Sequence, residues 1–210
     1  TREDEKLTSV VTLSDDTMKP DVRDLYKNIF ALTRDYEKHG VVCRPATEND
    51  IPALRRITPK IVAHMNDVGV PIWDDVYPVN MFPVDIEKKR LYVLDNGFDI
   101  VAVFALLEPF VDTAKNTVVW EEDGECAMYL YRLCVNTDYL GRGYASLAVE
   151  YAKALTRAMG RHYVRLYVVD TNKPAVRLYA KTGFRKADGV RVDDVSTGTV
   201  LIESGFEARV

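Results

Sequence analysis

The fold of this 210-residue chain is best predicted from the stretch Leu133-Cys-Val-Asn-Thr-Asp-Tyr-Leu-Gly-Arg-Gly-Tyr-Ala145. An apolar segment leads into a glycine-rich turn, and an amphipathic run follows at about 143–159, which predicts a strand, a turn and a long helix. Such a turn presents free backbone N–H groups and the positive end of a helix dipole to an anion. Gly141 and Gly143 carry no Cβ atom, so a phosphate can approach the backbone closely, and Arg142 adds a positive charge. A plain strand-to-helix turn without a ligand is the alternative.

Two common nucleotide-binding motifs do not fit this turn. A dinucleotide fingerprint needs an acidic residue about 20 positions further on, at the end of the next strand. The residue in that place is Asp170, 27 positions after Gly143, so the spacing is poor. A P-loop needs Gly-Lys-Ser/Thr, which the turn lacks. The turn therefore requires another explanation.

A second informative segment runs from Val168 to Phe184 and follows a strand expected at 163–169. Asn172 can cap a short helix at 174–181, and a proline in its first turn suits that position. Tyr179 stands seven residues after Asn172, two helical turns further on and on the same face. Packing within the core is the alternative role for Tyr179.

In this order, and about 30 residues apart, the two segments resemble the GNAT N-acetyltransferase superfamily. The resemblance covers roughly residues 41–206. It implies an α/β fold with a mixed, mostly antiparallel central sheet, flanked by helices and splayed into an acetyl-CoA cleft. It also implies two parts of the chain: an N-terminal extension at 1–40, with an amphipathic helix at about 20–39, and a catalytic domain at 41–210.

The resemblance implies roles for individual residues. The family signature Gln/Arg-x-x-Gly-x-Gly/Ala matches Gly143 and Ala145, whereas Leu140 replaces its leading Gln or Arg. In the family this turn donates backbone N–H groups to the pyrophosphate of CoA, and Arg142 offers a substitute for the missing charge. The implied cofactor-binding residues are Leu133, Cys134, Val135, Leu140, Gly141, Arg142, Gly143, Tyr144, Ala145 and Asn172.

The resemblance also implies the reaction. An amine attacks the acetyl thioester in a ternary complex, and a strand N–H near Val135 stabilises the developing oxyanion. Tyr179 lies beside the CoA sulfur and gives a proton to the leaving thiolate. A phenol with a reference pKa of ~10 can share a proton with a thiol of ~8.5 without being ionised at neutral pH. Acetyl-CoA is the only cosubstrate expected, and no metal is expected.

The general base and the acceptor site are harder to assign. Several carboxylates precede or begin the central strand, and among them Glu125 is the first choice for the base, with water, Tyr129 and Tyr131 as alternatives. The stretch Trp73-Asp-Asp-Val-Tyr77 lies where this superfamily covers its acceptor site. An aromatic wall of Trp73 and Tyr77 with Asp74 and Asp75 suits a cationic amine. The alternative is that Trp73 anchors the core and the aspartates lie on a loop surface.

The remaining pattern alternates helices and strands. Thr47 to Asp50 resembles a capping box with Asp in place of Glu, and it opens a helix that Pro59 is expected to break or kink. Residues 70–78 suggest a loop, and Asn96-Gly97 predicts a hairpin turn. The other expected strands lie at 41–44, 90–94, 100–107 and 127–135, near 184, and at 199–203.

Composition limits the partners and the location. The net charge is −4 and neither half carries a basic block, so nucleic acid is not an expected partner. The longest apolar stretches are strand-sized, well short of the ~20 residues that span a bilayer. Residues 1–6 are charged and give no secretory signal, which favours a cytoplasmic location. Three widely spaced cysteines fit reduced thiols.

The acceptor is predicted to be a primary amine on a small, amino-acid-like metabolite. A protein N-terminal or lysine amine is the alternative within enzymes. A non-catalytic CoA-binding regulatory module is the alternative from another class, suggested by Leu140 and the lack of a clear base. The apolar stripe at 20–39 would also suit a homodimer.

Overall fold

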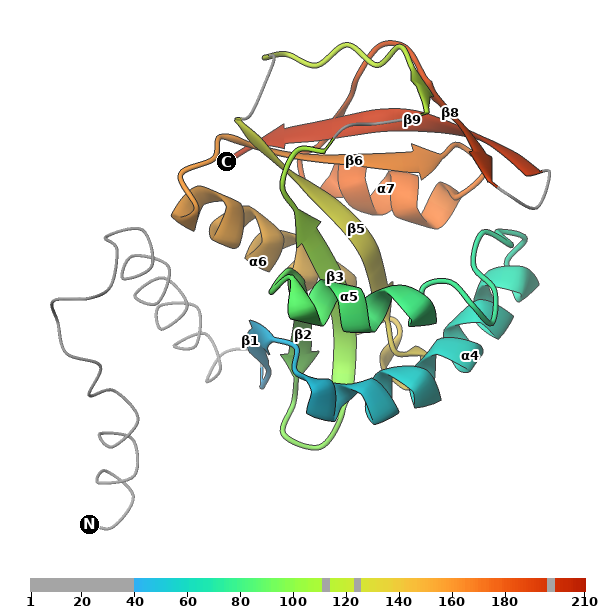
Figure 1. The fold of residues 1–210 in the computed structure, drawn as a ribbon, viewed down its shortest axis with the longest axis vertical. Coiled ribbons are helices and arrows are strands. Elements are labelled where there is room, and N and C mark those ends of the chain that lie inside the picture. The colour runs from blue at the N-terminus through green and yellow to red at the C-terminus, as the bar shows by residue number, and fades with distance from the viewer. Residues whose placement is uncertain (1–39, 111–113, 123–125, 196–198) are drawn as a thin grey trace, which may run out of the picture.

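The computed structural model describes residues 40–110, 114–122, 126–195 and 199–210 (Figure 1). In these ranges the chain forms a nine-stranded sheet in the order β1-β2-β3-β5-β6-β9-β8-β4, with β7 paired to β9. Its strands are β1 (Val42–Pro45), β2 (Leu91–Asp95), β3 (Ile100–Leu107), β4 (Lys115–Asn116), β5 (Ala127–Val135), β6 (Tyr163–Val169), β7 (Arg185–Lys186), β8 (Arg191–Val195) and β9 (Thr199–Arg209). The helices are α4 (Ile51–Asp67), α5 (Phe82–Glu87), α6 (Tyr144–Ala158) and α7 (Lys173–Lys181), with short 3-10 turns η1 (Glu48–Asp50), η2 (Val79–Met81) and η3 (Thr137–Tyr139). The helix expected at about 20–39 lies outside the described residues.

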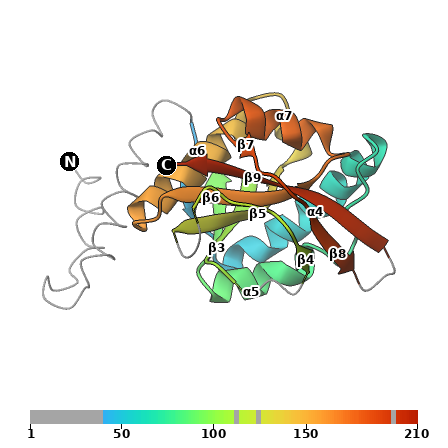
Figure 2. The ribbon, with the colours of Figure 1, turned by 90° about the horizontal axis from the view of Figure 1, so that it is seen from above.

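The sheet is mixed and mostly antiparallel, as predicted. Among the described strands, β5 and β6 form the one parallel pair. Helices α6 and α7 cover one face of the sheet, and α4 and α5 cover the other (Figure 2). Each face therefore has its own apolar core, one containing Ala148 and Leu155 of α6, the other Leu54 of α4 and Phe82 of α5.

Three predicted strands are confirmed with the same bounds, namely β3, β5 and β6. Strand β3 is buried along all eight residues, which is why its sequence is a continuous apolar run. Helix α6 buries Ala148, Tyr151, Ala152 and Leu155, the i, i+3, i+4, i+7 positions of its apolar stripe. The predicted helix at 143–159 is therefore confirmed to within one residue at each end.

Helix α4 corrects one expectation. It runs from Ile51 to Asp67 as one helix through Pro59, so the expected division into two helical stretches is wrong. A proline lacks the N–H that an inner turn would use, which costs about 3 kcal/mol or more. Leu54, Ile57 and Ile61 are all buried on one face of this helix, and their packing outweighs that cost.

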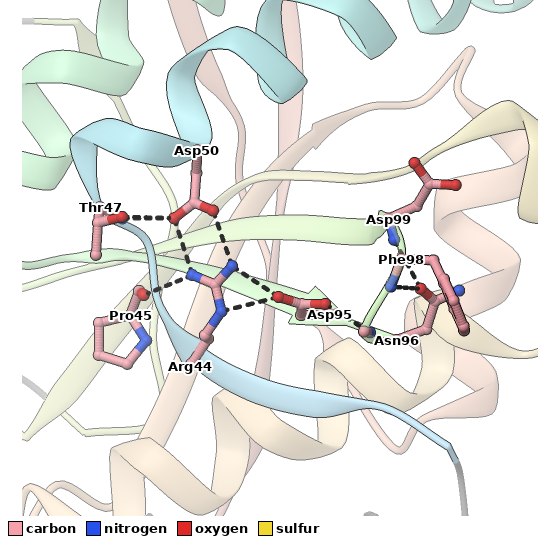
Figure 3. A network of polar contacts seen from close by, with 9 residues as sticks. Arg44, Pro45, Thr47, Asp50, Asp95, Asn96, Phe98 and Asp99 are labelled. Carbon is pink, nitrogen blue, oxygen red and sulfur yellow. Dashed lines mark hydrogen bonds and ion pairs between the residues drawn. The ribbon is translucent and has the colours of Figure 1, made fainter.

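A polar network ties the start of α4 to the sheet (Figure 3). Arg44 of β1 donates two hydrogen bonds of 2.8 Å to the carboxylate of Asp50, and its Nη2 donates to Asp95 of β2 at 2.7 Å. The backbone N–H of Thr47 donates to Asp50 at 2.7 Å, so the predicted capping box is confirmed. The hydrogen bond from Arg44 lowers the pKa of Asp50, although burial of the carboxyl opposes it.

We expect Asp50→Asn to lower the free energy of unfolding and to weaken its decrease at acidic pH. A hydrogen bond to a charged group contributes roughly 1.5–3 kcal/mol, so the free energy of unfolding at neutral pH should fall by about that amount. The folded pKa of Asp50 is depressed, so its contribution is complete above the unfolded value of about 3.9 and is lost as the pH falls through the folded pKa. Urea unfolding at a series of pH values measures this.

The matched control is Asp138→Asn, because Asp138 is 58% exposed and its partner is the exposed Lys60. This substitution should change stability little, since exposed ion pairs contribute about 0–1 kcal/mol. Parallel curves for the protein and for Asp50→Asn between neutral pH and about pH 3 would contradict the role of Asp50.

Candidate functional site

The glycine-rich turn has the geometry of an anion site. Gly141 and Gly143 have φ values of 75° and 83°, in the left-handed region that glycine adopts without strain. A Cβ atom at either position would meet no protein atom within 4 Å, so the space above the turn is open. Gly143 is the N-cap of α6, and the first N–H groups of this 15-residue helix have no partners in the helix. The guanidinium of Arg142 lies 5.0 Å from the ring centre of Tyr139 beside them.

The end of β5 forms an open edge next to this turn. Strand β5 pairs with β6 only where Ala127–Tyr129 meets Tyr163–Arg165, so the two strands separate beyond Tyr129. On its other side β5 stays paired with β3 as far as Val135. The N–H of Asn136 donates to Val101 of β3, and alternate residues of a strand point to opposite sides. The N–H of Val135 therefore points into the gap between β5 and β6.

Tyr179 lies in the core beneath this gap. Its side chain is buried, with the ring 5.5 Å from that of Phe184 and 6.4 Å from that of Phe206. Leu133 and Val135 of β5 pack against the same apolar cluster. Burial raises the pKa of Tyr179, and its phenol oxygen has no hydrogen-bond partner among the described residues. The phenol is therefore protonated at neutral pH, as a proton donor must be.

Asn172 is the N-cap of α7, as predicted. Its side-chain oxygen accepts a hydrogen bond of 3.2 Å from the N–H of Ala175. Its side-chain nitrogen donates to no described residue, so it can still bind a ligand.

The loop after α4 carries the predicted acceptor residues. The rings of Trp73 and Tyr77 meet edge to face with their centres 6.1 Å apart. Asp74 is exposed, and its carboxylate accepts the N–H groups of Val76 and Tyr77 at 2.8 and 2.7 Å. These backbone hydrogen bonds lower the pKa of Asp74. Asp74 thus stabilises the conformation of the loop. It lies on the loop surface, as the alternative interpretation of this stretch proposed.

The structure does not place the carboxylates near Glu125 as a general base. Glu125 lies outside the described residues, so the structure places no side chain for it. Glu122 accepts a hydrogen bond of 3.0 Å from the phenol of Tyr163. The aromatic alternatives Tyr129 and Tyr131 both lie near Phe110, with ring centres 5.5 and 6.0 Å away from its ring.

A buried charged group beside the open edge was missed by the sequence analysis. Arg132 of β5 has a side chain only 5% exposed, and its Nε donates at 2.6 Å to Asp85 of α5, whose side chain is fully buried. Arg90 donates to the other oxygen of Asp85 at 2.7 Å. The available signal was a single charged residue among the nine of Ala127–Val135. Its partner in the six-residue helix α5 had not been predicted.

Glu203 of β9 is a second missed carboxylate. It accepts a hydrogen bond of 2.5 Å from Arg191 of β8. Burial chiefly raises the pKa of Tyr77, and the negative charges of Asp85 and Glu203 add to that rise. Asp85 and Glu203 are therefore both within electrostatic reach of Tyr77, although the three residues come from a helix, a strand and a loop.

Other kinds of site receive no support from the described ranges. They contain no group of three or more His, Cys, Asp or Glu side chains that could hold a metal ion. None of the helices found there has the length and apolar character needed to span a membrane. All three cysteines are free thiols, as predicted, and burial raises the pKa of Cys43 and of Cys134 to about 12.

Comparison with known proteins agrees with this geometry. Residues 117–184, which include the turn and α7, match the Acetyltransferase (GNAT) family. A GNAT acetyltransferase from Streptococcus agalactiae 2603 superposes with a TM-score of 0.67 at 17% identity, over 81% of this chain and 95% of that one. One from Listeria monocytogenes 4b F2365 gives 0.62 at 16% identity, with the same coverage of each chain. The acetyltransferase yncA of Salmonella typhimurium, solved with its cofactor acetyl-CoA, gives 0.56 at 14% identity, over 81% and 94% of the two chains.

A search among curated proteins found no match. The mixed sheet, the open edge of β5 and the glycine turn give this chain the fold of the solved acetyltransferases. Residues 117–184 match the GNAT family model, and the fold of the described chain is similar to that of solved GNAT acetyltransferases.

Proposed function

We propose that this protein transfers the acetyl group of acetyl-CoA to a primary amine of a small metabolite. The observation that carries the proposal is the open edge of β5 next to the glycine turn at the start of α6. The free N–H groups of the turn suit a pyrophosphate, and the unpaired edge of the strand suits the pantetheine arm. The acetyl group then lies where β5 and β6 separate.

The chain's own residues supply the chemistry. The N–H of Val135 points into the gap and stabilises negative charge that develops on the acetyl oxygen. The protonated phenol of Tyr179 gives its proton to the leaving thiolate. For the base we propose Glu125, outside the described residues, with Glu203 as the second carboxylate because its charge reaches the acceptor loop.

Calorimetry with acetyl-CoA and a thiol-release assay test the function. Small amines and short peptides are supplied as two separate panels. Turnover with small amines supports the proposal, whereas turnover with peptides alone would replace it with a protein acetyltransferase. Binding of acetyl-CoA without turnover on either panel would indicate the regulatory module.

Tyr179→Phe should lower kcat by about 100-fold, because general acid catalysis typically contributes about 10²–10⁴-fold. The ring contacts with Phe184 and Phe206 are kept, so stability and the Kd of acetyl-CoA should change little. Tyr151→Phe is the control, because Tyr151 is a buried tyrosine of the same core on α6. A kcat unaffected by Tyr179→Phe at every pH would remove the role of the phenol.

The homodimer and the cytoplasmic location also remain proposals. Light scattering of the full chain and of a chain lacking residues 1–40 tests whether the predicted helix at 20–39 forms a dimer interface.

A further inference from the structure

Arg132 sits at a β-bulge. Tyr131 pairs with Ala105 of β3 and Cys134 pairs with Val103, so two residues of β5 face the single residue Phe104. Arg132 takes a φ of 53°, in the left-handed region that a non-glycine residue adopts at a cost of about 1–3 kcal/mol. This conformation turns an arginine of a central strand toward α5 and the loop that precedes it.

The ion pairs around Arg132 leave one positive charge without a counter-ion. Asp85 is a single carboxylate, and both Arg132 and Arg90 donate their Nε groups to it. In addition, Nη2 of Arg132 has less than 1 Å² exposed and no hydrogen-bond partner. In the described part of the chain, Thr156 Oγ1 is the one other buried side-chain atom in this state. Buried polar groups are nearly always paired, so this guanidinium has a donor and a charge free for a ligand.

Arg132 lies close to the loop that carries the proposed acceptor residues. Arg132 directly precedes Leu133, where the proposed pantetheine edge begins. Burial raises the pKa of Tyr77, and the nearby positive charge of Arg132 opposes part of that rise. Arg132 is thus next to the proposed pantetheine edge in sequence and close enough to Tyr77 to affect its pKa. Glu203 near the same loop already has Arg191 as its ion-pair partner.

We propose that the acceptor carries an anionic group, most simply a carboxylate, and that Nη2 of Arg132 binds it. This inference rests on the proposed function and names its substrate class, an amino acid or a similar small zwitterion. A guanidinium and a carboxylate form a strong charge-assisted hydrogen bond. The same positive charge lies near the acceptor's ammonium group, lowers its pKa and so increases the share of neutral, nucleophilic amine. A plain polyamine has no carboxylate for this donor.

The test compares the twenty standard L-amino acids with their carboxamides in the thiol-release assay. The two series differ in the charge that Arg132 would bind. A charged hydrogen bond contributes enough to predict that kcat/KM is about 10–100-fold higher for the preferred amino acid than for its amide. Arg132→Gln should remove this preference, mainly by raising the KM of the acid, and should leave the Kd of acetyl-CoA unchanged.

Arg90→Gln is the matched control. It takes the other guanidinium from Asp85 and leaves Nη2 of Arg132 in place, so it should keep the preference for the acid. Loss of the preference in both variants would mean that it depends on the Asp85 network as a whole, and this would overturn the inference. If Arg132→Gln does not fold, the comparison of acids with amides in the unaltered protein tests the inference.

The outcomes separate the two proposals. Equal kcat/KM for acids and amides leaves the proposed function in place and overturns the inference, with water as the occupant of the site. If neither these two series nor the panel of small amines is acetylated, the proposed function fails, and calorimetry with N-acetyl amino acids then decides the inference. Binding to the unaltered protein that is lost in Arg132→Gln supports it, and the absence of binding overturns it.

Discussion

Gly143→Glu should raise the Kd of acetyl-CoA by at least about 100-fold. The new carboxylate would stand at the N-cap of α6, where the pyrophosphate is proposed to lie. Two like charges about 4 Å apart repel by roughly 4 kcal/mol at an effective dielectric constant of about 20, and about 1.4 kcal/mol already corresponds to a tenfold change. No protein atom lies within 4 Å of the Cβ position, so the substitution meets no steric clash. Calorimetry with acetyl-CoA measures the effect.

Gly160→Glu is the control for backbone strain. Gly160 follows the other end of α6 and also has a positive φ, 71°, with open space at its Cβ position. A non-glycine residue in this conformation costs roughly 1–2 kcal/mol at either position, so both variants should lose similar stability. Only Gly143→Glu should lose affinity for acetyl-CoA. Equal Kd values for the two variants would show that the pyrophosphate does not bind at the turn.

The sequence was sufficient to predict the elements whose local residue pattern shows how they are buried or turned. Strands β3, β5 and β6 were predicted with the observed bounds because each is a strand-length run of apolar residues. The turn before α6 was predicted because glycine is the residue that adopts a positive φ without strain. These local signals also account for the predicted positions of Asn172 and Tyr179 on α7.

Sequence was insufficient where distant segments decide the outcome. Helix α5 has six residues, too few for a periodic pattern, and it exists because Phe82 and Asp85 are buried under the sheet. The left-handed Arg132 depends on the register between β3 and β5, which local sequence does not specify. Asp74 had a charge that suited an amine, but its two backbone hydrogen bonds follow from the conformation of the loop. The missed part of the site is therefore the acceptor side, which is assembled by long-range packing.

Glu207→Ala should cost about 3–5 kcal/mol of folding free energy, the usual loss when one member of a buried ion pair is removed. Glu207 of β9 faces Arg165 of β6 across the sheet, with both side chains 1% exposed and Nε to Oε2 at 3.2 Å. Glu207 also accepts the N–H of Glu121 at 2.8 Å and a hydrogen bond from Arg185. Without it the guanidinium of Arg165 stays buried beside the ring of Trp120, without its carboxylate. Urea unfolding measures the loss.

Two comparisons show whether this loss comes from an uncompensated buried charge. Glu150→Ala removes an ion pair with Lys153 in which Glu150 is 60% exposed, and it should change stability by no more than about 0.5 kcal/mol. The double variant Arg165→Met with Glu207→Leu removes both charges and should recover most of the loss, because apolar replacements of a buried pair are often neutral or stabilising. Recovery would mean that the loss in Glu207→Ala comes from leaving the charge of Arg165 buried without a partner. A double variant as unstable as Glu207→Ala would instead assign the loss to the hydrogen bonds that Glu207 makes with Glu121 and Arg185.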